Sequence, residues 1–305
     1  MRGFMVRLRR TVSRTAFLGL CLIAPAAQAQ QPVEDTETLA FDRPESWAMK
    51  YFTSLSLPTG MGLPERLGGG KIEVGFEGGL VPQLSDGQRR VGFDGTKLED
   101  VNKTRLLGRL RAKIGLPSSY SLELGYIPPV SVRGATPNIF SAAVGRPFVL
   151  SPSWRLGLRA YGQLGTLRAD ITCSAAEVAG GADLLRNPFR CEAPSNDALK
   201  QRLVGLEVTA GYGRGSWRPY VGMTVSHLNL QFQVDARYSG IVDHTLQTTN
   251  SNTVSVVAGV SYAPSARWRV VTELFYSPLS VVRPPQVGSQ NDGLLNGRFL
   301  VSHRF

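Results

Sequence analysis

Ten segments between residues 70 and 305 alternate an apolar residue with a small or charged one. In the segment 105–114, for example, the even positions hold Leu, Gly, Leu, Ala and Ile, whereas the odd positions are basic except for Leu107. A period of two places the two sets of side chains on opposite faces of a β-strand. The alternation therefore predicts an all-β domain of about ten strands, each with one apolar face.

The connections between these segments alternate in length. Tight turns are expected at 117–119, 151–153, 214–216 and 264–266, and longer polar links at 81–102, 170–199, 239–251 and 281–294, with a shorter one at 130–137. Turns on one side and long loops on the other are typical of transmembrane barrels. An open sheet would leave unpaired edges, which lipid does not tolerate. We therefore expect a closed antiparallel up-and-down transmembrane β-barrel in residues 70–305, preceded by a short helix.

Alternation alone does not decide which face points outward. A soluble sandwich turns its apolar face inward, whereas a membrane barrel turns it to lipid and lines its lumen with the polar face. Two further features favour the barrel. Arg and Glu recur on the polar faces, and aromatic residues on the apolar faces fall at strand ends, as in an interfacial girdle: Trp154, Tyr212, Trp217, Tyr262, Trp268 and Phe305.

The last strand adds a resemblance. Phe299, Val301, His303 and Phe305 share one face of a segment that ends on an aromatic residue. This segment resembles the C-terminal signature strand of Gram-negative outer-membrane β-barrel proteins, and departs from it at His303, where that pattern has an aromatic residue. The resemblance implies a location in the outer membrane, with outer-membrane lipid and the barrel-assembly machinery as partners.

The N-terminal region has two parts. Residues 1–29 have a basic start, a short apolar run and an Ala-Gln-Ala cleavage site, which predict a secretory signal peptide. Residues 30–69 are expected to be a periplasmic segment with an amphipathic helix that begins near Pro44 and ends before Pro58. This helix has three alternative places: against the membrane, as a cap under the barrel, or as a small plug inside it.

Cys173 and Cys191 fall in the longest polar stretch and remain after export. An even number of cysteines in an exported chain predicts a disulfide bond, here across a loop. A metal site is not expected, because no histidine lies near either cysteine in the sequence.

Charged residues on the polar faces are expected to line the lumen and to form a belt of ion pairs. They are Glu73, Arg109, Arg111, Glu123, Arg155, Arg159, Glu207, Arg269 and Glu273. Such a belt has two interpretations: it only satisfies polar groups in a closed core, or it lines a constricted passage that favours anions.

Catalytic motifs are not found. His227, His244 and His303 lack the serine spacing of membrane lipases, and Asp243-His244 near Asp235 has the wrong spacing for a barrel protease. No cofactor, metal or nucleic-acid site is predicted, and the chain is not expected to be an enzyme. Three hypotheses remain: a narrow porin-like channel for small anionic solutes, a non-conducting barrel whose extracellular loops bind a surface ligand, and, least favoured, a membrane-surface hydrolase.

Overall fold

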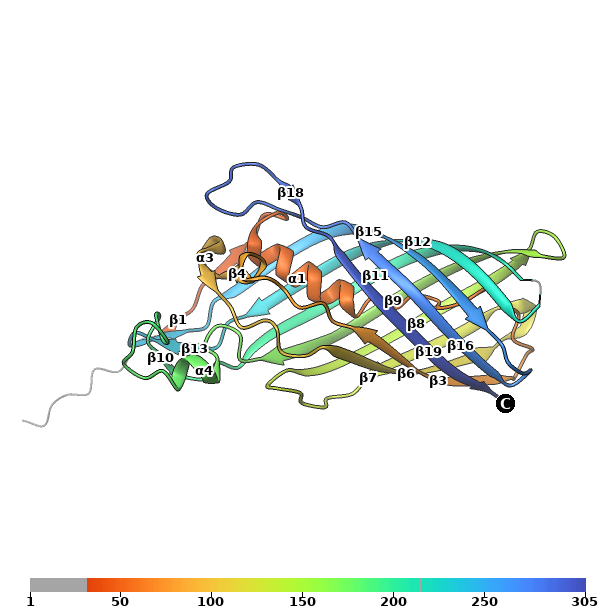
Figure 1. Cartoon of the computed structure of the whole chain (residues 1–305), viewed down its shortest axis with the longest axis horizontal. Helices are drawn as coiled ribbons and strands as arrows, with labels where there is room; N and C mark the ends of the chain where they lie inside the picture. Colours follow the sequence, from red (N-terminus) through yellow and green to blue (C-terminus); the bar gives the residue numbers. More distant parts are fainter. Residues whose placement is uncertain (1–31, 214) are drawn as a thin grey trace, which may run out of the picture. The chain divides into compact units, whose positions relative to one another are not determined.

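The computed structural model describes residues 32–213 and 215–305, so the predicted signal peptide lies outside the described residues. In this part of the chain, ten strands form one closed antiparallel sheet (Figure 1). Each strand pairs with the next in sequence, and the last pairs with the first. The strands are β3 (Ile72–Leu80), β6 (Leu106–Gly115), β7 (Ser121–Ile127), β8 (Thr136–Val149), β9 (Trp154–Ala169), β11 (Asp197–Tyr212), β12 (Trp217–Gln233), β15 (Leu246–Tyr262), β16 (Trp268–Ser277) and β19 (Leu294–Arg304). The predicted barrel and its strand count are confirmed.

The two ends of the barrel differ as the sequence predicts. Short connections, one of which contains the 3₁₀ turn η1 (Pro117–Ser119), join strands at what we call the turn end. Long connections at the opposite loop end carry small elements of their own. These are α2 (Asp86–Arg89), β4 (Arg90–Val91), α3 (Gly92–Gly95), β5 (Lys97–Leu98), α4 (Ala175–Val178), β10 (Cys191–Ala193), β13 (Ala236–Tyr238), β14 (Ile241–Asp243), β17 (Ser280–Val281) and β18 (Gln290–Asn291). Among the described residues, no helix has the length and apolarity needed to span a bilayer.

The apolar faces of the strands point outward. Phe76, Leu110 and Met223 are among the large apolar side chains exposed on the outer wall, whereas Glu73 and Arg109, on the opposite faces, are buried. At the turn end, aromatic rings from neighbouring strands pair, as in Trp154–Tyr212 and Trp217–Tyr262. An apolar wall with aromatic pairs at its rim is the surface expected of a barrel that faces lipid.

Strand β8 is more regular than its sequence indicates. Pro147 predicts a bulge, but β8 pairs with β9 without a register shift from Thr136 to Val149. Pro147 lies beyond Gly145, the last β8 residue that pairs with β7. The proline is therefore accommodated where β8 has no partner on that side, and its missing N–H breaks no ladder hydrogen bond.

The segment before the barrel begins at the loop end. Strand β1 (Pro32–Val33) pairs with β14, and β2 (Thr36–Thr38) pairs with the first residues of β15. Helix α1 (Pro44–Leu55) follows, with proline in its first turn as predicted. Trp47 and Leu55 pack in one core with inward residues of β11, β12 and β16. β-pairing and burial thus hold residues 32–55 at the loop end and in the lumen, away from the turn end at which a periplasmic segment is expected, and the periplasmic placement of residues 30–69 stays a prediction.

Candidate functional site

The lumen is filled by the chain itself. Residues 54–65, which we call the lumen segment, run from the end of α1 toward the start of β3 at the turn end. Five inward arginines donate hydrogen bonds to backbone carbonyl groups of this segment, most of them at 2.7–3.0 Å. The pairs are Arg298 with Ser54 and Leu57, Arg109 with Ser56, Arg159 with Pro58, Arg111 with Thr59, and Arg269 with Met61.

Carboxylates bind two further polar groups of the lumen segment, at Thr59 and Gly60. Both Glu207 oxygens accept from the Gly60 backbone N–H at 3.0 Å. Glu273 accepts from the Thr59 hydroxyl at 2.7 Å and from the Tyr220 hydroxyl at 2.9 Å. An irregular segment away from water needs partners for its backbone groups, and here the barrel wall supplies them.

Most of the inward charged side chains form a belt that consists of two ion-pair networks. Glu77 binds Arg109 and Arg111, both at 3.2 Å. Glu123 binds three bases at 3.1–3.2 Å: Arg111, Lys113 and Arg159. This network extends to Glu207 through Arg159 at 2.9 Å, and in a second network Glu73 pairs with Arg269 and Arg304. The predicted belt is thus present, and its arginines are neutralised by carboxylates.

Glu65 closes the turn end of the lumen. Its carboxylate binds Arg304 at 2.7 Å and Arg155 at 3.8 Å, and it also pairs with Arg218. Sequence reasoning missed Glu65, because it lies outside any alternating segment and no local pattern marks it. The nine residues predicted to line the lumen all lie on inward strand faces, with Arg155 and Arg111 less deeply buried than Glu73 or Glu207.

The residues of the predicted assembly signal lie on the outer face of β19. Phe299, Val301 and Phe305 are exposed, whereas His303 is half-buried between the rings of Trp268 and Phe305. His303 thus lies between aromatic rings at the position where the C-terminal signature strand has an aromatic residue. Recognition of this strand by the assembly machinery stays a prediction.

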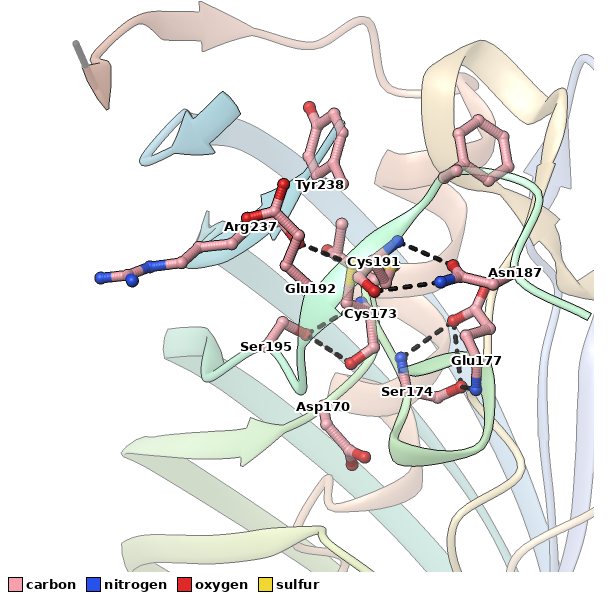
Figure 2. Close-up of a disulfide and its surroundings, with 12 residues drawn as sticks. Asp170, Cys173, Ser174, Glu177, Asn187, Cys191, Glu192, Ser195, Arg237 and Tyr238 are labelled. Atoms are coloured by element: carbon pink, nitrogen blue, oxygen red, sulfur yellow. Dashed lines mark hydrogen bonds between the residues drawn. A yellow bond between two sulfur atoms is a disulfide. The ribbon is translucent and has the colours of Figure 1, made fainter. Parts of the chain in front are cut away.

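The predicted disulfide joins Cys173 and Cys191 at the loop end (Figure 2). Buried Asn187 fixes the loop that the disulfide closes: its amide bonds the carbonyls of Gly181 and Cys191, and it accepts from the Cys191 N–H at 2.7 Å. Figure 2 also shows the reciprocal Ser174–Glu177 cap that begins α4. This bracing leaves Leu185 95% exposed at the loop tip.

Three long connections pack together into what we call the loop platform, residues 81–105, 170–196 and 234–245. Lys97 is 1% exposed and donates to the Thr172 carbonyl and to Glu99. Phe93 stacks on Phe189 with ring centroids 5.5 Å apart. Burial raises the pKa of Glu99 to about 8, although Lys97 opposes the shift. The platform is therefore an ordered surface with its own small core.

The three histidines do not meet a catalytic partner set in the described part of the chain. His227 contacts Asn252 at 2.8 Å on the outer wall, and His244 lies 3.5 Å from Asp235 at the loop end. Within residues 32–213 and 215–305, no group of three or more His, Cys, Asp or Glu side chains is arranged to hold a metal ion.

Comparisons with known proteins were made for the sequence and for the structure. A family model described as "Opacity family porin protein" matches residues 181–293, and no curated protein matches the chain. Similar solved structures include the N-terminal β-barrel domain of Pseudomonas aeruginosa OprF, with 10% identity over 78% of this chain and 100% of that one and a TM-score of 0.30. Ail of Yersinia pestis has 12% identity over 78% and 99%, with a TM-score of 0.31. The outer membrane protease OmpT from Escherichia coli has 11% identity over 77% and 92%, with a TM-score of 0.34.

The porin-family match agrees with the lipid-facing wall and the closed sheet described above. The protein is an outer-membrane β-barrel of the Gram-negative type.

Proposed function

We propose that this barrel is closed along its axis and acts through its loop end, where the loop platform binds a partner outside the cell. The observation that carries the proposal is the lumen segment. Its carbonyl groups accept hydrogen bonds from the arginines that an anion pathway would need. Other charged side chains of the lumen form ion pairs with one another. A passage selects anions through unpaired positive charge, which this belt does not offer.

The loop platform has the properties of a preorganised binding surface. Its longest loop is held by a disulfide and by Asn187, so little conformational entropy remains to be lost on binding. Leu184 and Leu185 are exposed at its tip, next to exposed Arg186. Apolar side chains held out in water beside an arginine are typical of interaction surfaces. The partner that fits this tip has an apolar patch with acidic groups beside it.

A binding experiment tests the proposal. The full chain in lipid nanodiscs is applied to arrays of glycans and extracellular-matrix proteins, and the double variant L184S/L185S is compared with V287S. Val287 is 99% exposed in a different loop, so V287S is a control that also removes an exposed apolar side chain. We expect wild type and V287S to bind the same array member and L184S/L185S to lose it. Equal binding by all three, or by none, would contradict the proposal.

The narrow conduit is the second candidate function. It is favoured by the concentration of arginine around the lumen segment, which is held by hydrogen bonds and by the packing of Leu57 and Met61 in the core. Conduction then requires residues 54–65 to leave the lumen. Planar-bilayer recording of the full chain separates the two candidates: silence supports the closed barrel, whereas stable anion-selective steps support the conduit. We also propose a non-catalytic role, which turnover of phospholipid or peptide by the purified barrel would overturn.

A further inference from the structure

The barrel wall is incomplete next to β7. This strand ends at Ile127 because Pro128 and Pro129 follow, and proline has no N–H to donate to a ladder. Strand β6 therefore pairs with β7 only from Leu110 to Gly115. Residues 106–109 of β6 and 136–138 of β8 flank the place where a longer β7 would lie. We call this interruption the wall gap.

An apolar cavity of about 370 Å³ passes through the wall gap. On the outer side it is lined by Phe76, Leu106 and Leu110, which are lipid-facing and about half exposed. On the inner side it is lined by Phe52 of α1 and by Leu199, an inward residue of β11. One cavity thus contacts both the lipid-facing surface and the interior of the barrel.

A second cavity, of about 360 Å³, adjoins the first toward the loop end. The two cavities share five apolar lining residues, namely Phe52, Val101, Leu167, Ile171 and Leu199. The far side of the second cavity is polar and includes Glu37, Arg43 and Asp243. Toward the turn end, the interior is closed by Ser56, Gln163 and Arg109, which are joined by hydrogen bonds.

We propose that the two cavities form one route by which a small, uncharged apolar molecule passes from the loop end, sideways through the wall gap, into the outer leaflet. Each cavity has the volume of a small-molecule site, for which the usual range is about 300–1,000 Å³. The apolar lining excludes ions, and the ion-pair belt closes the axis, so the wall gap is the exit that remains. Residues of the loop platform, such as Val91 and Asp243, line the second cavity, but the exposed tip at Leu184 and Leu185, where we propose that a partner binds, lines neither cavity.

Leu167 is the residue with which to test the route, because it lines both cavities where they meet. L167W fills the junction. L164W is the matched control, since Leu164 lies on the same strand but faces lipid and is 59% exposed. The probe for the site is an alkylbenzene that carries a photoreactive diazirine, mapped by mass spectrometry on the full chain in nanodiscs. Entry is followed with N-phenylnaphthylamine, whose fluorescence rises when it enters the outer membrane of intact cells.

We expect the diazirine probe to label residues at the junction in wild type and L164W, with displacement by unlabelled alkylbenzene and a loss of about tenfold in L167W. N-phenylnaphthylamine entry should fall in L167W to the rate of cells without the protein. F52A, which widens the junction, should keep or raise entry, and heat-modifiable migration identifies which variants fold. Equal labelling in L167W, an unchanged entry rate in both L167W and F52A, or cavities filled by a co-purified lipid acyl chain that alkylbenzene does not displace would overturn the proposal.

Discussion

Glu123 illustrates how single residues hold the lumen together. Its carboxylate is bound by Arg111, Lys113 and Arg159, which come from two different strands, β6 and β9. Two of these bases also donate to carbonyls of the lumen segment. The loss of one carboxylate therefore affects the strands and the segment that they enclose, because a buried pair that loses one partner leaves an uncompensated charge.

The substitution Glu123→Gln tests this dependence. It leaves three bases facing a neutral amide, and we expect it to lower the free energy of unfolding by about 3 kcal/mol. Urea unfolding of the detergent-folded barrel, followed by heat-modifiable migration, measures the change. Glu34→Gln, at an exposed position, serves as the control and should leave the unfolding midpoint in place. A midpoint for E123Q equal to that of E34Q would show that the belt contributes little to stability.

Glu99 makes the loop platform sensitive to pH. Burial raises its pKa in the folded protein to about 8, whereas the unfolded chain releases this proton near pH 4.5. The folded state therefore holds a proton that the unfolded state has lost, so this contribution to stability is complete below pH 4.5 and is lost as the pH rises through 8. We expect hydrogen-exchange protection factors around residues 92–99 to fall between about pH 6 and about pH 9, and Glu99→Gln to remove the fall. Protection factors that are the same at both pH values in wild type would contradict this prediction.

Among the elements, the disulfide-closed loop is joined to the barrel wall mainly through Asp197 at the start of β11. Its bonds run mainly within residues 170–196 and to the neighbouring loops, through contacts such as Cys191–Asn187 and Lys97–Thr172. The ten strands are held by their own ladders. Loosening this loop should therefore leave the barrel intact.

The double variant C173S/C191S tests the independence of these two parts. Closing a loop of this size stabilises by about 3 kcal/mol in the chain-entropy account. We expect faster proteolytic cleavage between residues 173 and 191, with unchanged heat-modifiable migration of the barrel. Loss of the folded band in the variant would show that loop and wall fold together.

The alternation in the sequence predicts the strands and the two faces of each strand, because a period of two directly reports the side on which each side chain lies. The sequence also predicts the start of α1, since Pro44 and Glu45 mark a first helical turn. The sequence pattern does not predict where α1 packs, because an apolar stripe packs equally well against lipid, a barrel mouth or a lumen. The pattern also does not predict the ion pairs of Glu65, because alternation identifies inward charges but not the partners of each charge.

The wall gap shows a different limit of the sequence. Pro128 and Pro129 were visible signals for the end of β7. What they leave open depends on the lengths of β6 and β8, which continue past that point on either side. Strand lengths emerge from pairing between distant segments, and such pairing cannot be read from one local pattern.

For the whole molecule, the central claim is that the chain enters the barrel from the loop end and fills the lumen on its way to β3. Residues 32–38 then lie with the long loops, which face the outside of the cell in barrels of this kind. At the turn end, the same segment closes the lumen through the ion pairs of Glu65 with Arg218 and Arg304. A periplasmic N-terminal segment would require the opposite order.

Labelling of intact cells tests this claim most directly. Glu34 is exposed beside β1 and is replaced by cysteine, with Cys173 and Cys191 kept in their disulfide. A membrane-impermeant maleimide is added to intact cells and, separately, to cells with a permeabilised outer membrane. The account predicts equal labelling of E34C in both samples and none of wild type. Labelling that appears only after permeabilisation would place the segment in the periplasm and contradict the filled lumen.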